Sequence, residues 1–588
     1  MKSKIDRAAL AAAVSNLQGL TSEQKSAFLE LINDHKKYGL VWEDKPENVE
    51  ERLRDELPIL REVKDRAIIS DAPDAPNHVI IEGDNLEALT ALSYTHEGRI
   101  DVIYIDPPYN TGNKDFVYND QYVDSEDSYR HSKWLSFMNK RLKIAKRLLS
   151  DRGVIFISID DNEQAQLKLL CDEVFTQSSF IASAVRRRRK SQANLSKNIS
   201  TIHEYVLIYK KTDLYELNKI EADLNLSEYK NPDNDPRGPY KTMPCTNKGG
   251  SVYSIVTPTG KKITEEWRFK SDTYYSLFND NRIVFPKGGE GKPRYKLFLA
   301  EKTEGGVLDN SWWEDYGSNQ EGAVLLKDIF GEERFNNPKP IGLINHILKL
   351  SSQKSSTILD FFAGSGTTLH ATMQLNAEDG GHRQCILVTN NENGICENVT
   401  YERNKRVICG YTTPKGQQVE GLKENNLRYY KIDSVPREQT ATNKRQLMEV
   451  STDLLCIKHN LYDEKNTFFG LKLPKQMARY FEEQGRGMLI IYRPDAIPYI
   501  VKALAKVDRL AEPIQTYVAC DGAYPYTDDF HGVIDRVELH AMPYSLYQAY
   551  RQVLPPKSER QDFADLPEVS VKELNEADAN LYTSEDHD

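Results

Sequence analysis

The sequence predicts an α/β fold: a doubly wound, Rossmann-like sheet with an inserted domain and with flanking helical and α/β modules. Two stretches predict the sheet. Residues 100–105 form a largely apolar run that is followed by an acid and two prolines, and residues from 358 on have the pattern of a strand that leads into a glycine turn and a helix. Apolar runs of this length, bounded by turn residues, are typical of buried strands. The chain of 588 residues has room for roughly two to four domains.

The first motif, Asp106-Pro107-Pro108-Tyr109, places an acid and an aromatic ring on a stiff corner. It lies at the carboxyl end of the first strand, where ligands bind in open α/β sheets. The Asp106 carboxylate and the Pro107 carbonyl can each accept one N–H of an exocyclic amino group on a nucleic-acid base, which localises the lone pair of that nitrogen. Tyr109 can stack on the base, which must be flipped out of a duplex to arrive there. The alternative is that the tetrapeptide is only a turn.

The second motif is the turn from Asp360 to Thr368, in which two glycines let the backbone approach a ligand and a threonine can cap the next helix. A Gly-x-Gly turn alone is weak evidence. Combined with the first motif, it resembles the amino-methyltransferases that use S-adenosyl-L-methionine, in which Phe-x-Gly-x-Gly holds the cofactor. This resemblance assigns the cofactor contacts in the turn to Asp360, Phe362, Gly364, Gly366 and Thr367, with Asp106 also at the cofactor.

The catalytic motif precedes the cofactor motif by about 250 residues. This permuted order resembles the β group of DNA amino-methyltransferases, in which the segment between the motifs carries target recognition. The Asp before Pro-Pro-Tyr resembles the adenine-N6 enzymes more than the cytosine-N4 enzymes. The resemblance implies double-stranded DNA with a flipped adenine as substrate, a direct methyl transfer and no metal.

Residues 36–43 and 400–403 resemble the modification subunits of type III restriction-modification systems. The resemblance implies a homodimer and a restriction subunit, with nuclease and translocase activity, as a further partner. The predicted domains are a helical arm (1–66), the catalytic half of the methyltransferase domain (77–212), the target-recognition domain (213–330), the cofactor-binding half (331–411), a C-terminal α/β module (412–555) and an acidic tail (556–588). The arm is either a solvated helical segment or a dimer or partner contact. The C-terminal module contains no evident catalytic cluster.

The catalytic half begins with a short strand at 79–81, a turn and a helix over 86–94. In the resembling family, the acid of this turn contacts the adenine of the cofactor, which assigns that role to Asp84 with Asn85 beside it. An amphipathic helix over 132–150 buries Trp134. After a strand at 154–159, the acids of residues 160–163 fit a capping box better than a catalytic role.

The densest basic run is Arg186-Arg187-Arg188-Arg189-Lys190. Five like charges repel one another and must be solvated or paired, and DNA phosphates supply such pairing. We therefore predict phosphate contacts, with a solvated loop as the alternative. Interleaved aromatic and basic residues over 213–330 suit contacts to bases and backbone.

Two further residues are assigned by resemblance. Lys339, in a Pro-Lys-Pro segment, corresponds to a position beside the methionine end of the cofactor and can bind its carboxylate; the alternative is an ordinary solvent-facing lysine. Many relatives place an acid directly after the strand at 385–389 to hold the cofactor ribose. This chain has Asn390-Asn391-Glu392 there, so Glu392 is the candidate.

The net charge of −11 is unevenly distributed. Ten acidic and three basic residues give the tail −7, so −4 remains for residues 1–555. DNA binding needs a basic face rather than a basic protein, so this balance excludes nothing. Seven scattered cysteines favour a reducing compartment, and the lack of a long apolar run favours a cytoplasmic protein without a membrane span. A cytosine-N4 or RNA methylase would share these motifs, and a DNA-reading recruitment subunit with little turnover is the other class.

Overall fold

The structure is a computed structural model. It describes residues 42–113, 115–119, 121–191, 199–220, 225–303, 306–507 and 510–556. Most of the predicted arm, including residues 36–41, and all but the first residue of the acidic tail lie outside the described residues. Two compact units divide the chain: the first contains Glu62–Asn85 and His96–Lys431, and the second contains Pro46–Arg61, Leu86–Thr95 and the described residues from Ile432 on.

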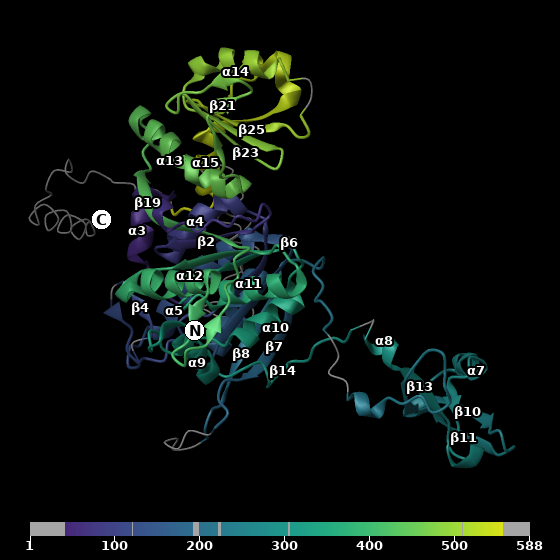
Figure 1. The fold of residues 1–588 in the computed structure, drawn as a ribbon. Helices are drawn as coiled ribbons and strands as arrows, with labels where there is room; N and C mark the ends of the chain where they lie inside the picture. The colour runs from purple at the N-terminus through teal and green to yellow at the C-terminus, as the bar shows by residue number, and fades with distance from the viewer. Residues whose placement is uncertain are drawn as a thin grey trace, which may run out of the picture. The chain divides into compact units, whose positions relative to one another are not determined.

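The first unit is built on a large sheet with the strand order β19-β2-β16-β15-β3-β6-β8-β7-β14 (Figure 1). Every neighbouring pair is parallel except the two pairs that include β8. The strands are β2 (Asn77–Glu82), β3 (Ile100–Ile105), β6 (Leu149–Ile159), β7 (Phe180–Arg187), β8 (His203–Lys210), β14 (Trp312–Trp313), β15 (Thr357–Asp360), β16 (Gln384–Thr389) and β19 (Asn426–Pro436). This confirms the predicted doubly wound α/β fold.

The two motif strands lie side by side. β15 pairs with β3 in parallel, with Ile358 opposite Val102 and Leu359 opposite Ile103. The two motifs are separated by about 250 positions in the sequence, and they therefore meet at the carboxyl ends of neighbouring strands, as the permuted order predicts. Both strands are buried on two faces, which explains why they are continuous apolar runs rather than alternating ones.

Helices cover both faces of the sheet. Val102 and Tyr104 of β3 and Val206 of β8 share one hydrophobic cluster with side chains of α9 to α12, which stand in front of the strands in Figure 1. On the other face, the ring of Tyr209 in β8 lies 5.7 Å from that of Phe175 in α6. The helices are α5 (Arg130–Leu148), α6 (Gln164–Phe175), α9 (Asn319–Phe330), α10 (Ile341–Ser351), α11 (Thr367–Asp379) and α12 (Glu402–Cys409).

Two predicted domain bounds differ from the structure. β14 pairs with β7, and Trp313 and Ile329 belong to the core of the large sheet, so residues 312–330 are not part of the inserted region. β19 pairs with β2 from Asn426 to Lys431, so the C-terminal module begins later than residue 412. A two-residue strand and a strand of mixed polar and apolar residues carry little periodicity, so the sequence pattern missed both.

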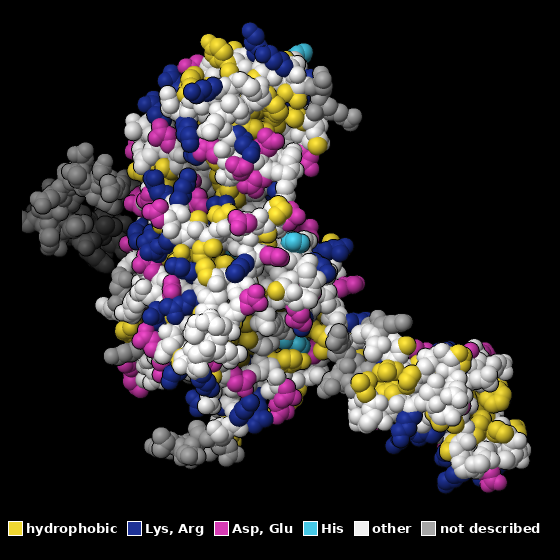
Figure 2. Space-filling model, in the orientation of Figure 1, with side chains coloured by type: hydrophobic (Ala, Val, Ile, Leu, Met, Phe, Trp, Pro, Cys, Tyr) yellow, Lys and Arg dark blue, Asp and Glu magenta, His cyan; other side chains and the backbone are white. Residues whose placement is uncertain are grey.

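The inserted region, here called the lobe, consists of the described residues 225–303. β10 and β11 form an antiparallel hairpin, and Trp267 and Tyr274 pack with Cys245 and Ile255 in a small core. Figure 2 shows hydrophobic patches and Lys or Arg side chains on its visible face. The elements are β9 (Tyr240–Pro244), β10 (Thr246–Val256), β11 (Lys262–Trp267), α7 (Ser271–Asn279), β12 (Ile283–Val284), β13 (Arg294–Phe298) and α8 (Leu299–Thr303).

The second unit has its own sheet in the order β20-β23-β24-β25-β26. Residues 47–66, predicted to be helical, differ: a strand follows the first helix because Pro58 interrupts helical hydrogen bonding and Leu57, Ile59 and Leu60 are buried. The elements are α3 (Asn48–Asp55), β1 (Glu56–Glu62), most of α4 (Asn85–His96), α13 (Ala441–His459), β20 (Glu464–Lys465), β21 (Thr467–Phe468), β22 (Leu471–Lys472), β23 (Ala478–Glu483), β24 (Arg486–Ile491), α14 (Ile497–Leu504), β25 (Ile514–Ala519), β26 (Val537–Met542) and α15 (Tyr544–Arg551). Within the described part of the chain, no helix combines the length and the low polarity that a membrane span requires.

Candidate active site

Four adjacent parallel strands end at one edge of the large sheet and present the predicted site residues there. β2 leads to Asp84, β16 to Glu392, β15 ends at Asp360, and β3 leads to Asp106. The carboxyl ends of parallel strands form the binding edge of a doubly wound sheet. The structure therefore brings the predicted cofactor and catalytic residues to one edge.

The corner from Asp106 to Tyr109 is here called the catalytic corner, after its predicted role. A buried lysine, Lys339, lies at this corner and contacts two carboxylates. The Lys339 ammonium lies 2.9 Å from Oδ1 of Asp106 and donates a 2.8 Å hydrogen bond to the hydroxyl of Tyr109. The carboxylate of Glu204 lies 3.4 Å from the same ammonium and accepts a 3.2 Å hydrogen bond from Tyr109. The side chain of Lys339 is 8% exposed, whereas that of Asp106 is 27% exposed. Asp106 and Tyr109 are thus the partly exposed members of this group, and Lys339 and Glu204 are buried.

The position of Lys339 excludes the solvent-facing alternative. Its ammonium lies among three oxygen-bearing side chains, those of Asp106, Tyr109 and Glu204. Its contact with the carboxylate of the cofactor stays a prediction.

Arg186 closes the cluster from the next strand, where it is the cross-strand partner of Glu204. Its guanidinium pairs with the Glu204 carboxylate and donates 3.0 Å hydrogen bonds to the Gly317 carbonyl and to Asn319. The predicted phosphate contact is therefore wrong for Arg186, because its side chain is 1% exposed.

The rest of the basic run is more exposed. Arg187 pairs with Glu314 at 2.8 Å and Lys190 pairs with Glu321 at 2.7 Å. Arg188 lies 3.8 Å from Asp160, and Arg189 is exposed. For these four residues, DNA contact stays a prediction.

The backbone of the corner is fixed from α5 and α6. The indole N–H of Trp134 donates a 2.7 Å hydrogen bond to the Pro108 carbonyl. Asn110, in a left-handed conformation at φ 57°, donates a 2.6 Å hydrogen bond to Glu163, which also contacts Nδ1 of His131 at 2.6 Å. The predicted capping box is wrong: the Glu163 side chain is fully buried in this cluster and makes no cap hydrogen bond.

Burial and charge set the protonation of these acids in different directions. Burial raises the pKa of Asp106 above its usual range, although the Lys339 ammonium opposes this rise. The pKa of Glu204 is lowered because Lys339 and Arg186 outweigh its burial. Burial raises the pKa of Glu163 to about 8.

The glycine turn has a conformation that requires glycine. Gly364 and Gly366 have φ of 48° and 72°, and a Cβ at Gly366 would meet Nδ2 of Asn404 at 2.5 Å. The hydroxyl of Thr368 donates a 2.5 Å hydrogen bond to Asp360. The expected threonine cap is wrong, since the helix N-cap is Gly366. Thr367 instead accepts a 2.7 Å hydrogen bond from the buried Arg403.

Asp84 and Asn85 are tied to the glycine turn and to α5. Nδ2 of Asn85 donates a 3.1 Å hydrogen bond to the Phe361 carbonyl, and Nε of Arg141 donates a 2.5 Å hydrogen bond to Asn85. Arg141 also lies 3.6 Å from Asp84, whose side chain is 34% exposed. Glu392 is exposed after β16. Across the described residues, no cluster of three or more His, Cys, Asp or Glu side chains could hold a metal ion.

Sequence reasoning missed Glu204, Arg141, Glu163 and Arg403. A signal existed for the first: Glu204 alternates with Val206 and Ile208 on the core face of its strand, and a carboxylate on such a face requires a cation. Arg141 and Arg403 lie on helices and Glu163 directly precedes one, and their sequence spacing does not reveal a partner.

The edge that carries both motifs defines a doubly wound α/β protein with the layout of a methyltransferase. The chain belongs to the DNA methylase family, whose model matches residues 100–405, more than half of the sequence.

Three relatives have names that describe a restriction-modification subunit or a methyltransferase. The type III restriction-modification enzyme StyLTI Mod subunit of Salmonella typhimurium is 39% identical over 342 residues, which cover 53% of this chain and 52% of that protein. The EcoPI Mod subunit of Escherichia phage P1 is 31% identical, with 58% of this chain and 62% of that protein covered. The type II methyltransferase M.KpnI of Klebsiella pneumoniae is 33% identical, with 58% and 87% covered. The chain thus spans less than two thirds of the length of the two Mod subunits.

Proposed function

We propose that this protein transfers a methyl group from S-adenosyl-L-methionine to N6 of adenine in double-stranded DNA, as the modification subunit of a type III restriction-modification system. The observation that carries the proposal is the placement of Asp106-Pro107-Pro108-Tyr109 and the glycine turn on adjacent strands. The names of two relatives support the type III part, and the Asp before Pro-Pro-Tyr supports the adenine part.

The residues at the sheet edge fit the proposed cofactor. Its methionine end would approach the turn of Gly364 and Gly366, where a Cβ would collide with neighbouring atoms. Asp84 supplies an accessible carboxylate for a nucleoside, and the half-buried Phe362 supplies an aromatic ring. When bound, S-adenosyl-L-methionine supplies a methyl group on a sulfonium that a nucleophile can take directly.

The corner residues would orient the target nitrogen. The amino group of a flipped adenine donates one N–H to Asp106 and the other to the Pro107 carbonyl, which directs the nitrogen lone pair toward the methyl group. Tyr109 packs against the base while its hydroxyl is held by Lys339 and Glu204. The new C–N bond forms as the old C–S bond breaks, and the nitrogen then releases one proton. Catalysis in this scheme is positioning plus electrostatics.

The partners belong to the same proposal. The lobe and the exposed residues of the basic run, Arg187 to Lys190, would contact the DNA, and the protein would act as a homodimer. A separate restriction subunit would supply cleavage, as the Mod names of the relatives suggest.

The test uses nucleoside mass spectrometry. Purified protein is incubated with unmethylated DNA and S-adenosyl-L-methionine, beside Asp106→Ala. We expect N6-methyladenine with the wild type and a loss of at least about 10³-fold with Asp106→Ala, since a group that orients the reacting atom is removed. Cofactor binding by equilibrium dialysis should change little.

Each result has a distinct meaning. N4-methylcytosine in place of N6-methyladenine would refute the base assignment and keep the methyl-transfer chemistry. DNA binding without any methylation would favour a recruitment subunit. Wild-type turnover by Asp106→Ala would refute the role of this carboxylate.

A further inference from the structure

The cluster around Lys339 links residues from four separate stretches of the first unit. Asp106 and Tyr109 follow β3, Glu204 lies in β8, Arg186 lies in β7, and Lys339 precedes α10. Two acids and two bases meet there, so the formal charges balance. Three of these four ionised side chains, Arg186, Glu204 and Lys339, are at most 8% exposed. Burying so many charges is costly unless each one has a partner.

The hydrogen bonds of this cluster follow one donor-to-acceptor order, from Lys339 through Tyr109 to Glu204. Lys339 donates to Tyr109, and Tyr109 donates to Glu204, so the tyrosine hydroxyl uses both its acceptor and its donor. Arg186 anchors Glu204 as its cross-strand partner and is itself held by Gly317 and Asn319. The fixed end of this chain is therefore the sheet, and the free end is the accessible carboxylate of Asp106.

We infer that Lys339 and Glu204 are positioning residues of the catalytic corner: Glu204 anchors Lys339 and Tyr109, and the Lys339 ammonium holds Asp106 as an ionised hydrogen-bond acceptor. This inference rests on the proposed function. Neither residue needs to touch the base or the cofactor. Both act through Asp106 and Tyr109.

The two residues have opposite electrostatic effects on Asp106. The groups that face Asp106 are Lys339, Glu204, Tyr109, Tyr104 and Asp360. Among them, Lys339 lowers the pKa of Asp106, whereas the negative charge of Glu204 raises it. Removing Lys339 should therefore raise the pKa of Asp106 further and leave it protonated near neutral pH. Removing the charge of Glu204 should lower it.

This contrast defines the experiment. The single-turnover methylation rate is measured from pH 5.5 to 9.5 for the wild type, Lys339→Met, Lys339→Arg and Glu204→Gln. The acidic limb is the part of the pH profile in which the methylation rate rises from low pH. We expect the acidic limb of Lys339→Met to move to higher pH. Its rate should fall about tenfold or more below that of the wild type at pH 6.5, and the difference should shrink at pH 9, since one pKa unit is a factor of ten. The limb of Glu204→Gln should move to lower pH, and Lys339→Arg should keep the wild-type limb.

The matched control is Lys349→Met. Lys349 is on α10, close to Lys339 in sequence, and forms an exposed 2.7 Å pair with Glu378. Its pH profile should equal that of the wild type. Thermal melting and cofactor binding identify a variant that has lost its fold. If Lys339→Met does not fold, Glu204→Gln, which keeps the shape of the side chain, decides the matter.

Limbs that stay in place for both variants, or move in the same direction, would overturn the inference. A wild type that methylates no base would instead defeat the proposed function. In that event, the titration of the Asp106 carboxyl by infrared difference against Asp106→Asn still tests the inference without turnover. Its midpoint should rise in Lys339→Met and fall in Glu204→Gln, and an unchanged midpoint would refute the proposed coupling.

Discussion

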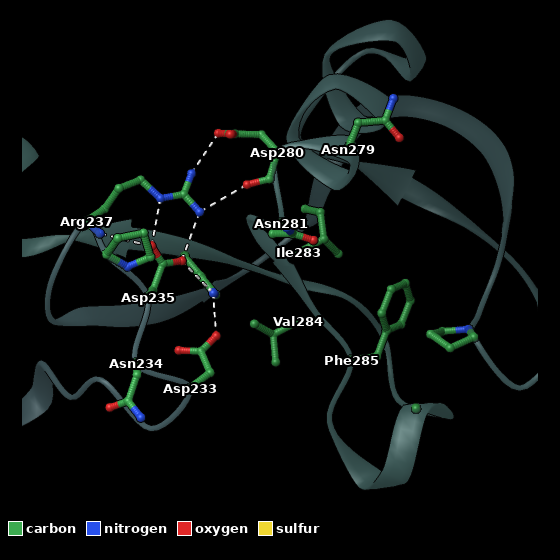
Figure 3. A pocket seen from close by; sticks show the side chains of 14 residues that line it. Asp233, Asn234, Asp235, Arg237, Asn279, Asp280, Asn281, Ile283, Val284 and Phe285 are labelled. Carbon is green, nitrogen blue, oxygen red and sulfur yellow. Dashed lines mark hydrogen bonds and ion pairs between the residues drawn. The ribbon is translucent and has the colours of Figure 1, made fainter.

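The catalytic corner and the lobe contain the same set of side chains in a similar arrangement. In the corner, Lys339 lies between Asp106 and Glu204, with Tyr109 and Arg186 beside them. The lobe repeats this set with different residues. There, Lys296 lies between two aspartates, with a tyrosine and an arginine beside them; these residues are Asp233, Asp235, Tyr240 and Arg237. Figure 3 shows Arg237 of this cluster between Asp235 and Asp280.

The lobe cluster is a structural clamp at the edge of a pocket of about 850 Å³. Lys296 contacts Asp233 at 2.5 Å and Asp235 at 2.8 Å, and Arg237 binds both oxygens of Asp235 at 2.9 Å. Arg237 also reaches Asp280 at 2.8 Å. These bonds join the loop before β9 to β13 and to the end of α7. A small lobe with few buried side chains gains rigidity from such links.

The same residue types have opposite protonation behaviour in the two places. Hydrogen bonds from Arg237 and Lys296 hold the pKa of Asp235 far below its usual range. Burial raises the pKa of Asp106, even with a lysine in contact. Asp235 therefore stays ionised at any ordinary pH, whereas Asp106 depends on its lysine to remain so. Exposure does not explain this difference, because the side chain of Asp235 is 5% exposed and that of Asp106 is 27% exposed. Asp235 accepts hydrogen bonds from two cations, Arg237 and Lys296, whereas Asp106 contacts one, Lys339, so the cationic partners decide whether the carboxyl can titrate.

The largest expected effect of breaking the lobe cluster comes from Lys296→Met. Removing one partner of a buried ion pair costs about 3–5 kcal/mol, and we expect about 2–3 kcal/mol of lobe stability here, because Asp233 is half exposed and water can replace the lysine. Hydrogen exchange of the β9 and β13 amides measures this loss. The acidic limb of the methylation rate should stay in place, unlike that of Lys339→Met.

The control in the lobe is Lys292→Met, since Lys292 forms an exposed pair with Glu265 at 2.5 Å. Such surface pairs contribute at most about 1 kcal/mol. Equal loss of exchange protection in both variants would contradict the clamp. A shifted pH limb in Lys296→Met would remove the distinction between the two clusters.

The sequence predicted the strand ends better than it predicted the contacts between them. The runs that became β3 and β15 are largely apolar, and their turns contain prolines or glycines, so local pattern was enough to find Asp106 and Gly364. Lys339 and Glu204 are 135 residues apart, and no local pattern links them. Arg186 was assigned to DNA because it belongs to a basic run, but its strand position places it opposite Glu204 on the core face. Cross-strand register decides this, and a single sequence does not reveal it.

Asp360 is a buried carboxyl whose hydrogen bonds come from the Thr368 hydroxyl and the Phe362 backbone N–H rather than from a cation. Burial raises its pKa to about 7. A carboxyl whose pKa is raised on folding stabilises the protein below its unfolded pKa and loses that contribution as pH rises through the folded value. We therefore expect Asp360→Asn to stabilise the protein at pH 8 relative to pH 5, by about 1–2 kcal/mol. Thermal unfolding at the two pH values measures this difference.

Asp379→Asn is the control with the opposite sign. Arg383 lowers the pKa of Asp379 through 2.8 Å and 3.0 Å hydrogen bonds. A carboxyl of this kind stabilises the protein above its unfolded pKa, and the contribution fades as pH falls. Asp379→Asn should thus destabilise the protein at pH 8. If the stability of Asp360→Asn relative to the wild type is the same at pH 8 as at pH 5, Asp360 is not a buried carboxyl that resists ionisation.

The smallest expected effect separates the two ends of the basic run, where Arg186 is buried and Arg189 is exposed. If Arg189 contacts a DNA phosphate, Arg189→Ala should weaken DNA binding by about three- to fivefold at moderate salt and reduce the salt slope by about one. Fluorescence anisotropy at several salt concentrations measures both quantities, with Lys349→Ala as the matched surface control. Arg186→Ala should behave differently, since it leaves Glu204 buried beside Lys339 alone and so lowers stability rather than the salt slope. An unchanged salt slope in Arg189→Ala would show that the exposed part of this run is a solvated loop. The structural role of the run would then be limited to Arg186, which forms the buried pair with Glu204.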